Sequence, residues 1–126
     1  MKVERFEELI AWQKAMDLAV RVYELAETGK IAKRFALRDQ MERAGLSVPS
    51  NIAEGFERAS RAEFHRFLSI AKGSCAELRT QLYLAHRLRY IDDATLKQLL
   101  GDAEEVGRIV GKLRKSVGPQ RPPKSS

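Results

Sequence analysis

The side chains that could bind a metal or act as a nucleophile are few and far apart. Two histidines, His65 and His86, are 21 residues apart on one predicted helix, hence roughly 30 Å apart, too far to share a metal ion. The single cysteine, Cys75, falls on an apolar helix stripe, which favours a buried thiol over a reactive one. Three neighbouring carboxylates each have a role at a helix end or facing an arginine: Glu54, Glu57 and Glu63. We therefore predict no catalytic residue, no metal site and no cofactor, and expect that the protein is not an enzyme.

The cationic side chains are more numerous and indicate a different chemistry. The formal net charge is +6 and the isoelectric point is about 9.7. Residues 30–91 carry a net charge of +6 and the last fifteen residues +5, while residues 1–29 and 92–111 are acidic. This distribution favours contact with a phosphate backbone, although a run of charges is often only a solvated helix face. The candidate nucleic-acid-binding residues are Arg58, Arg61, Arg66, Lys72, Arg79, Arg87, Arg89, Lys112, Arg114 and Lys115.

Length and composition are typical of one helical domain. The chain has 126 residues, is 44% hydrophobic and 32% charged, and contains only 4 Pro and 8 Gly, too few turn residues for a many-stranded β protein. One cysteine cannot form an internal disulfide. The N-terminal sequence lacks a signal-peptide apolar stretch, and no window approaches the ~20 apolar residues that span a bilayer. We therefore expect a cytoplasmic protein without membrane contact.

Four segments of the chain carry apolar residues at helical spacing. They are residues 7–27, 35–56, 60–90 and 93–117. The connections between them are short, which predicts an all-α, antiparallel up-down-up-down four-helix bundle over residues 1–117. Residues 118–126, rich in proline and basic side chains, are predicted to form a disordered basic tail.

Local signals define the predicted helices further. Ser60 and Glu63 form a capping box that starts the third helix. Pro49 lies inside the second helical pattern and either bends or breaks that helix; one bent helix is favoured because the apolar spacing continues through it. The apolar stripe of the first helix, predicted to face the core, is Leu9, Trp12, Met16, Ala19, Tyr23 and Ala26.

A polar stripe flanks the predicted core face of the second helix. Its members are Gln40, Arg43, Ser47, Asn51 and Glu54. Antiparallel pairing about a turn near Arg58 places Gln40 opposite Glu77 and Arg43 opposite Ser74. The sequence therefore predicts an ion pair between Arg43 and Glu77 in this seam, where a half-buried charge requires a partner.

Small and leftover apolar residues indicate a close helix contact. Ala103, Gly107 and Gly111 follow one another at spacing four on the fourth helix, and Leu84 and Leu88 remain outside the core stripe of the third. Such residues either form an interface between copies of the chain or pack tightly within one bundle. Both alternatives stay open at this point.

Four segments of the sequence resemble one protein family. They are FEELIAWQKAMDLAV, LRDQMERAG, SVPSNIAEGFERAS and EFHRFLSIAKGSCAELRTQL. The chain resembles the four-helix-bundle family named after proteins encoded in intervening sequences of bacterial 23S ribosomal RNA genes. It is also similar to the accessory variability determinant of diversity-generating retroelements, a homopentameric barrel that binds a reverse transcriptase and nucleic acid. The matching motif positions are Gln40, Arg43, Ser47, Pro49, Asn51, Glu54, Gly55 and Arg58.

The resemblance carries expectations about assembly and function. It implies a homopentamer of bundles, no catalysis, and an adaptor role toward RNA, DNA or a ribonucleoprotein, with a reverse transcriptase among the implied partners. The sequence departs from the family pattern at Ala36 and at Gly45-Leu46. The alternative is a protein–protein interaction scaffold whose cations only solvate the helices.

Overall fold

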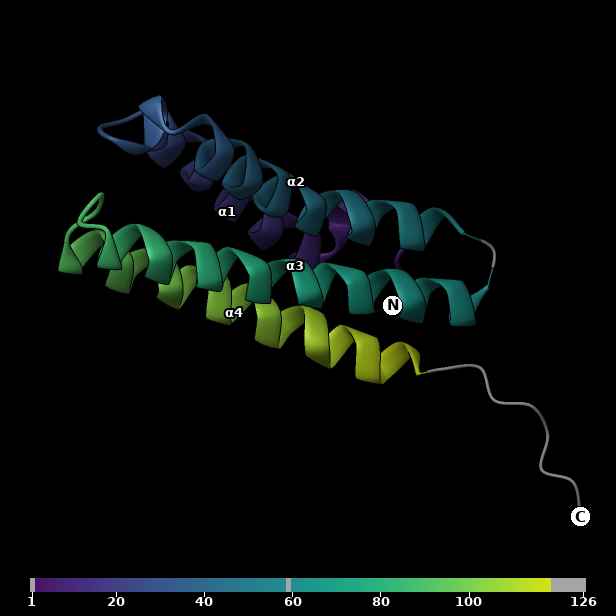
Figure 1. Cartoon of the computed structure of the whole chain (residues 1–126). Coiled ribbons are helices and arrows are strands. Elements are labelled where there is room, and N and C mark those ends of the chain that lie inside the picture. Colours follow the sequence, from purple (N-terminus) through teal and green to yellow (C-terminus); the bar gives the residue numbers. More distant parts are fainter. Residues whose placement is uncertain (1, 59, 119–126) are drawn as a thin grey trace, which may run out of the picture.

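The structure is a computed structural model that describes residues 2–58 and 60–118, and within these ranges it is all-α with no strand (Figure 1). The four helices are α1 (Ile10–Ala26), α2 (Phe35–Glu57), α3 (Arg61–Arg87) and α4 (Asp93–Val117). Two short 3-10 helices, Phe6–Glu8 and Ile31–Lys33, precede α1 and α2. Each helix packs against two others, in the order α1, α2, α3, α4 and back to α1. The four predicted helices are thus confirmed, while residues 119–126 of the predicted tail lie outside the described residues.

Helix ends follow the capping residues of the sequence. The Ser60 side chain accepts a hydrogen bond of 3.1 Å from the Glu63 N–H and starts α3 as predicted. The Asp92 side chain caps α4 in the same way and accepts a hydrogen bond of 2.8 Å from the Thr95 N–H. The third helix ends at Arg87, three residues before the predicted end, because Arg89 adopts a positive φ of 64° that no α-helix can contain.

The second helix runs unbroken from Phe35 to Glu57. Pro49 is buried inside it, so the favoured prediction of one continuous helix over two short ones is confirmed. Proline removes one backbone hydrogen bond, and packing against the neighbouring helices compensates for that loss.

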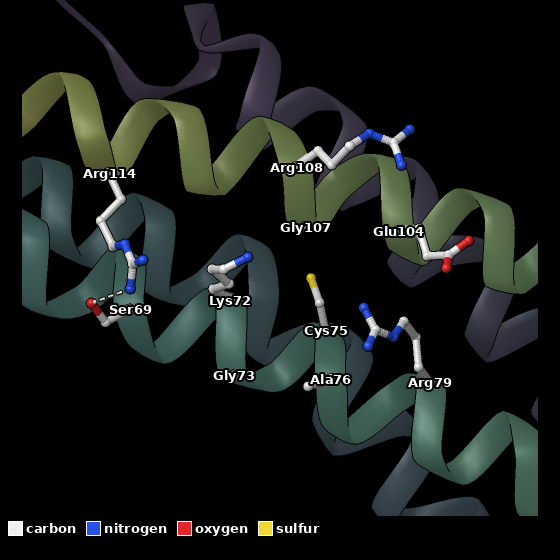
Figure 2. A pocket seen from close by; sticks show the side chains of 10 residues that line it. All are labelled: Ser69, Lys72, Gly73, Cys75, Ala76, Arg79, Glu104, Gly107, Arg108 and Arg114. Carbon is white, nitrogen blue, oxygen red and sulfur yellow. Dashed lines mark hydrogen bonds between the residues drawn. The ribbon is translucent and has the colours of Figure 1, made fainter.

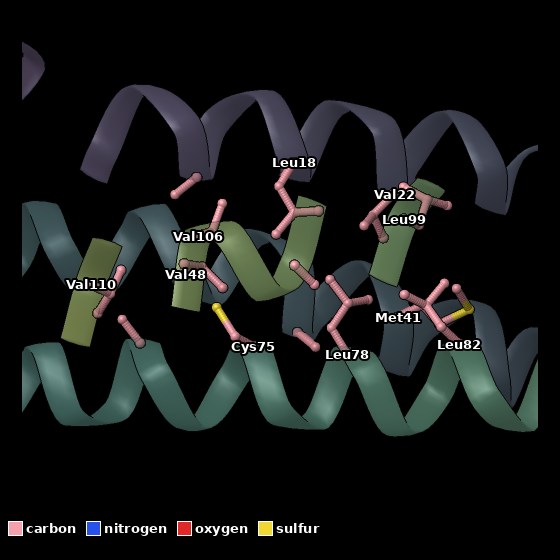
Figure 3. Packing of buried hydrophobic residues seen from close by; sticks show 14 of the residues in the cluster. Leu18, Val22, Met41, Val48, Cys75, Leu78, Leu82, Leu99, Val106 and Val110 are labelled. Atoms are coloured by element: carbon pink, nitrogen blue, oxygen red, sulfur yellow. The ribbon is translucent and has the colours of Figure 1, made fainter. Parts of the chain in front are cut away.

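The core runs along the centre of the bundle and receives apolar side chains from all four helices (Figure 3). The largest fully buried side chains include Leu18, Met41, Ile52, Leu78 and Val110. None of the helices in the described part of the chain carries an apolar stretch long enough to cross a membrane.

The buried side of α1 differs from the predicted stripe. Its fully buried residues are Ala11, Ala15, Leu18, Ala19, Val22 and Ala26. Of the predicted stripe, Leu9, Ala19 and Ala26 are buried as expected. Trp12 and Met16 are only partly buried and Tyr23 is exposed. The helix has two apolar stripes about one residue apart, roughly 100° around its axis, and the alanine-rich stripe faces the core because its small side chains let neighbouring helices approach. The larger apolar side chains remain at the outer edge.

Candidate nucleic-acid interface

A groove between α3 and α4 gathers cations from both helices (Figure 2). It consists of two adjoining hollows of about 510 and 790 Å³, which share Lys72, Arg108 and Arg114 as lining residues. We call it the α3–α4 groove. Its six Lys and Arg side chains are Lys72, Arg79, Arg108, Lys112, Arg114 and Lys115.

Small residues let the two helices approach each other at the floor of the groove. A Cβ added at Gly107 would lie 3.8 Å from Cys75 Cβ, and one at Gly111 would lie 3.5 Å from Lys72 Nζ. Both glycines therefore pack against α3 of the same chain. Of the two alternatives for the stripe of small residues, this arrangement corresponds to tight packing within one bundle. The Lys72 side chain extends across the space that a larger residue at position 111 would occupy.

The cations of the groove are not neutralised by the protein. Among the described residues, none of the six lies within 4.0 Å of a carboxylate oxygen. Arg114 Nη1 donates a 3.3 Å hydrogen bond to the neutral Ser69 Oγ, and Glu104 is the one carboxylate that lines the groove. Because like charges held together favour an anionic partner, the groove is suited to phosphate groups.

The spacing of the cations matches an extended ligand. His65, Lys72 and Arg79 recur every seven residues on the side of α3 that faces the groove, which places them about 10 Å apart along the helix. Arg108, from α4, was not among the predicted residues. The feature of the sequence that could have identified Arg108 is its position next to Gly107, which belongs to the stripe of small residues on α4.

Three predicted cations serve the structure at the turn between α2 and α3. Arg58 forms an ion pair of 2.8 Å with Glu54, and Arg66 one of 3.1 Å with Glu63. The Arg61 guanidinium donates to the backbone carbonyl oxygens of Ser116 and Val117 in the last turn of α4, where the helix dipole favours a cation. These side chains are less available to a ligand than those of the groove.

The last two predicted cations lie at the other end of α3. Arg87 and Arg89 line a hollow of about 760 Å³ beside the turn between α3 and α4, together with Tyr90. The ten predicted residues therefore divide among three places and do not form one surface.

The seam between α2 and α3 is held by neutral side chains. Ser47 Oγ and Ser74 Oγ are 2.8 Å apart, and Asn51 Nδ2 donates to the Ser47 carbonyl oxygen at 2.8 Å and to its hydroxyl at 2.9 Å. The predicted Arg43–Glu77 ion pair is wrong: no contact within 4.0 Å joins them, and both residues are exposed.

The pairing register explains that error. Ser74 faces Ser47 rather than Arg43, a difference of one helical turn, because α2 continues to Glu57 and α3 begins only at Arg61, which centres the pairing later in the chain than the predicted turn near Arg58. Gln40 is likewise exposed, away from the seam contacts.

Glycine at position 55 is required by the same seam. A Cβ there would lie 2.6 Å from Phe67 Cβ and 3.1 Å from Phe64 Cδ1, closer than real side chains approach. Gly55, Pro49 and the serine pair thus give the SVPSNIAEG segment a structural explanation.

The thiol and the two histidines have no common site. Cys75 is 2% exposed, and burial raises the pKa of its thiol to about 11, which keeps it protonated near neutral pH. His65 lines the α3–α4 groove, whereas His86 Nε2 lies 2.5 Å from Asp93 Oδ1 at the far end of α3. Within residues 2–58 and 60–118, no group of three or more metal-binding side chains is found.

An apolar hollow lies between α1 and α2. It measures about 270 Å³ and its apolar walls come from Met16, Val20, Tyr23 and Leu46. Two carboxylate side chains, Glu24 and Glu27, also line it. This α1–α2 hollow lies along the apolar stripe of α1 that does not face the core.

Comparisons with known proteins place the chain among relatives of unknown function. Residues 7–112 match the sequence pattern of a family described as 23S rRNA-intervening sequence protein. A crystal structure of a protein with unknown function from the S23 ribosomal protein family, from Bacteroides thetaiotaomicron, is 28% identical in sequence. The two structures align with a TM-score of 0.77 over 84% of this chain and 99% of that chain. No curated protein matches the sequence.

Proposed function

The chain belongs to the 23S rRNA-intervening sequence protein family, and from that premise we propose that it is a non-enzymatic adaptor that binds RNA or DNA backbones through the α3–α4 groove. The observation that carries the proposal is a set of six Lys and Arg side chains along two packed helices that have no carboxylate partner within the part of the chain that the structure describes. The family name concerns the location of its genes and does not supply this function.

Backbone contact without base readout is the mode of binding that the groove supports. Among the described side chains that line it there is no Phe, Tyr or Trp, and its one imidazole is that of His65, so bases have no large ring on which to stack. Phosphates can reach the cations along the groove, and such contacts depend little on the base sequence. We infer that structured RNA or a duplex binds with little sequence preference.

The proposal includes self-assembly. We propose an up-down-up-down bundle that associates as a homo-oligomer, with five copies as the expected number. Leu84 near the end of α3 and Leu88 just after it are each 47% exposed, and repetition of the groove around a ring would multiply its charge. Light scattering of the purified protein measures the number of copies, and Leu84→Glu with Leu88→Glu is expected to reduce it.

A salt titration tests nucleic-acid binding. Fluorescence anisotropy with a labelled RNA duplex should show affinity that falls steeply with salt, by a slope of about 0.9 per phosphate contact. The double variant Lys72→Gln with Arg108→Gln should lower that slope by about 2. The matched control is Arg66→Gln with Lys14→Gln, which removes two cations that already have carboxylate partners. No binding by the wild type at low salt would refute the proposal.

The second candidate function, a protein-interaction scaffold, has one observation in its favour. The α1–α2 hollow exposes apolar side chains beside two carboxylates, which suits a partner with an apolar surface and a basic edge. Affinity purification that returns a protein partner despite nuclease treatment, and loses it with Leu46→Lys, would favour the scaffold over the adaptor.

A further inference from the structure

The connections at one end of the bundle form a second cationic surface. Residues 27–34 join α1 to α2 and residues 88–92 join α3 to α4, and both lie at the left of Figure 1. We call this the loop end. Its cations come from both connections and from the last turn of α3: Lys30, Lys33, Arg34, Arg87 and Arg89.

The two connections are in contact with each other. The Arg34 guanidinium carbon lies 5.8 Å from the centre of the Tyr90 ring, a cation–π contact between them. Within the described part of the chain, none of the five cations is within 4.0 Å of a carboxylate. Charges from segments far apart in sequence are therefore assembled on one surface.

Arg89 occupies a backbone position that normally favours glycine. The Tyr90 N–H bonds the Ala85 carbonyl at 2.8 Å and the Arg89 N–H bonds that of His86 at 2.9 Å, the hydrogen-bond pattern of a helix end with a left-handed residue. The φ of Arg89 is 64°. The connection after α1 uses Gly29 at a φ of 56° instead, so this chain uses glycine at one helix end and arginine at the other.

The carboxylates beside Arg89 are already engaged. Asp92 accepts the Thr95 N–H at 2.8 Å as the N-cap of α4, and this hydrogen bond lowers the pKa of its carboxyl. Asp93 lies 2.5 Å from His86 Nε2. Neither carboxylate forms an ion pair with Arg87 or Arg89, which remain available to a ligand.

An aromatic ring distinguishes the loop end from the α3–α4 groove. Tyr90 is half-buried against the core and lines a hollow of about 760 Å³ together with Arg87 and Arg89 and the carboxylates Asp92 and Asp93. A ring beside guanidinium groups can stack an unpaired base while the cations hold its phosphates. A paired base inside a duplex cannot reach such a ring.

We propose that the loop end is a second nucleic-acid contact, specific for unpaired nucleotides, in which Arg89 binds a phosphate from its left-handed position and Tyr90 stacks a base. This inference rests on the proposed nucleic-acid function. It adds a substrate class, single-stranded segments, that the groove does not select, since the described residues lining it include no Phe, Tyr or Trp.

The test compares two labelled probes, an oligouridylate strand and a blunt RNA duplex, with wild-type protein and Arg89→Gly. Glycine relieves the backbone strain, so the variant should melt roughly 4 °C higher. It should nevertheless bind the single strand about five-fold more weakly and the duplex within about two-fold of wild type. A variant that is more stable and binds less cannot owe its loss to unfolding.

Two further variants make the outcome decisive. Arg89→Lys keeps the charge and should retain single-strand affinity, while Arg5→Gln, which removes a cation paired with Glu7 at 3.1 Å, should change neither probe. Unchanged single-strand binding by Arg89→Gly, or equal losses for both probes, would overturn the inference while the groove proposal stands. Failure of the wild type to bind either probe would instead refute the proposed function.

Discussion

The two flanks of α3 perform different tasks with the same kinds of residue. On the flank toward α2, glycine and serine close the seam: Gly55 lies against Phe67, and Ser74 bonds Ser47. On the flank toward α4, Gly73 has no atom within 4 Å of the position of an added Cβ, and Lys72 and Arg79 line an open groove. Small residues produce tight packing on one flank and ligand access on the other.

The difference separates the most recognisable sequence feature from the candidate function. The SVPSNIAEG segment belongs to the closed flank, where its side chains bond one another and the helix opposite. The six cations of the α3–α4 groove belong to the open flank. Stability and binding should therefore respond to different substitutions.

The largest expected effect comes from adding one methyl group to each flank. Gly55→Ala should cost about 2 kcal/mol of the free energy of unfolding, because its Cβ would overlap Phe67. Gly73→Ala should gain up to about 1 kcal/mol, because alanine favours the helix and the added Cβ meets nothing. Urea denaturation of both variants measures the difference, about 3 kcal/mol.

Equal effects of the two substitutions would contradict the comparison. Gly73→Ala should also leave duplex binding nearly unchanged, since it removes no cation. This serves as the control that the open flank tolerates small changes of shape.

A smaller effect is expected from Cys75, which lies between the core and the floor of the groove. Its thiol pKa is raised by burial to about 11 from the ordinary value of 9.0. In the unfolded chain the thiol ionises first, so the folded state is favoured fully below pH 9.0 and loses this advantage as pH rises toward 11. The loss should be of the order of 2 kcal/mol.

Comparison with Cys75→Ala isolates this contribution from other groups that titrate at high pH. The wild type should lose stability faster than the variant between pH 9 and 11 in urea denaturation. If the stabilities of the wild type and the variant fell in parallel with pH, water would reach the thiol through the α3–α4 groove, and the floor of that groove would not be closed.

The sequence predicted the elements better than their pairing. Helix periodicity, the Ser60 cap and the continuous helix through Pro49 agree with the structure, because each depends on local spacing. The Arg43–Glu77 pair failed because register depends on where the chain reverses, and one turn of error replaces every partner. No local signal distinguishes the two apolar stripes of α1, since only packing determines which one faces inward.

The sequence predicts which kinds of residue form the candidate site, but not which of the cations lie together without carboxylate partners. Lys72, Arg79 and Arg114 were found from charge alone, yet Arg58 and Arg66 carry the same charge and are paired with carboxylates. Which cation remains free depends on neighbours from other helices, as the position of Arg108 beside Lys72 illustrates. The sequence of one helix does not contain that information.

The smallest expected effect tests the two flanks with a matched pair of serines. Ser69 and Ser74 both donate a side-chain hydrogen bond to the carbonyl four residues earlier, at 3.1 and 3.2 Å, but only Ser74 also bonds α2, through Ser47. Ser74→Ala should therefore cost about 1 kcal/mol, and Ser69→Ala less than about half of that, as measured by urea denaturation. Ser69→Ala also releases Arg114 and should leave duplex affinity equal or slightly higher. If Ser69→Ala were the more destabilising change, the groove flank would be holding the bundle together, and the division between a closed and an open side of α3 would be wrong.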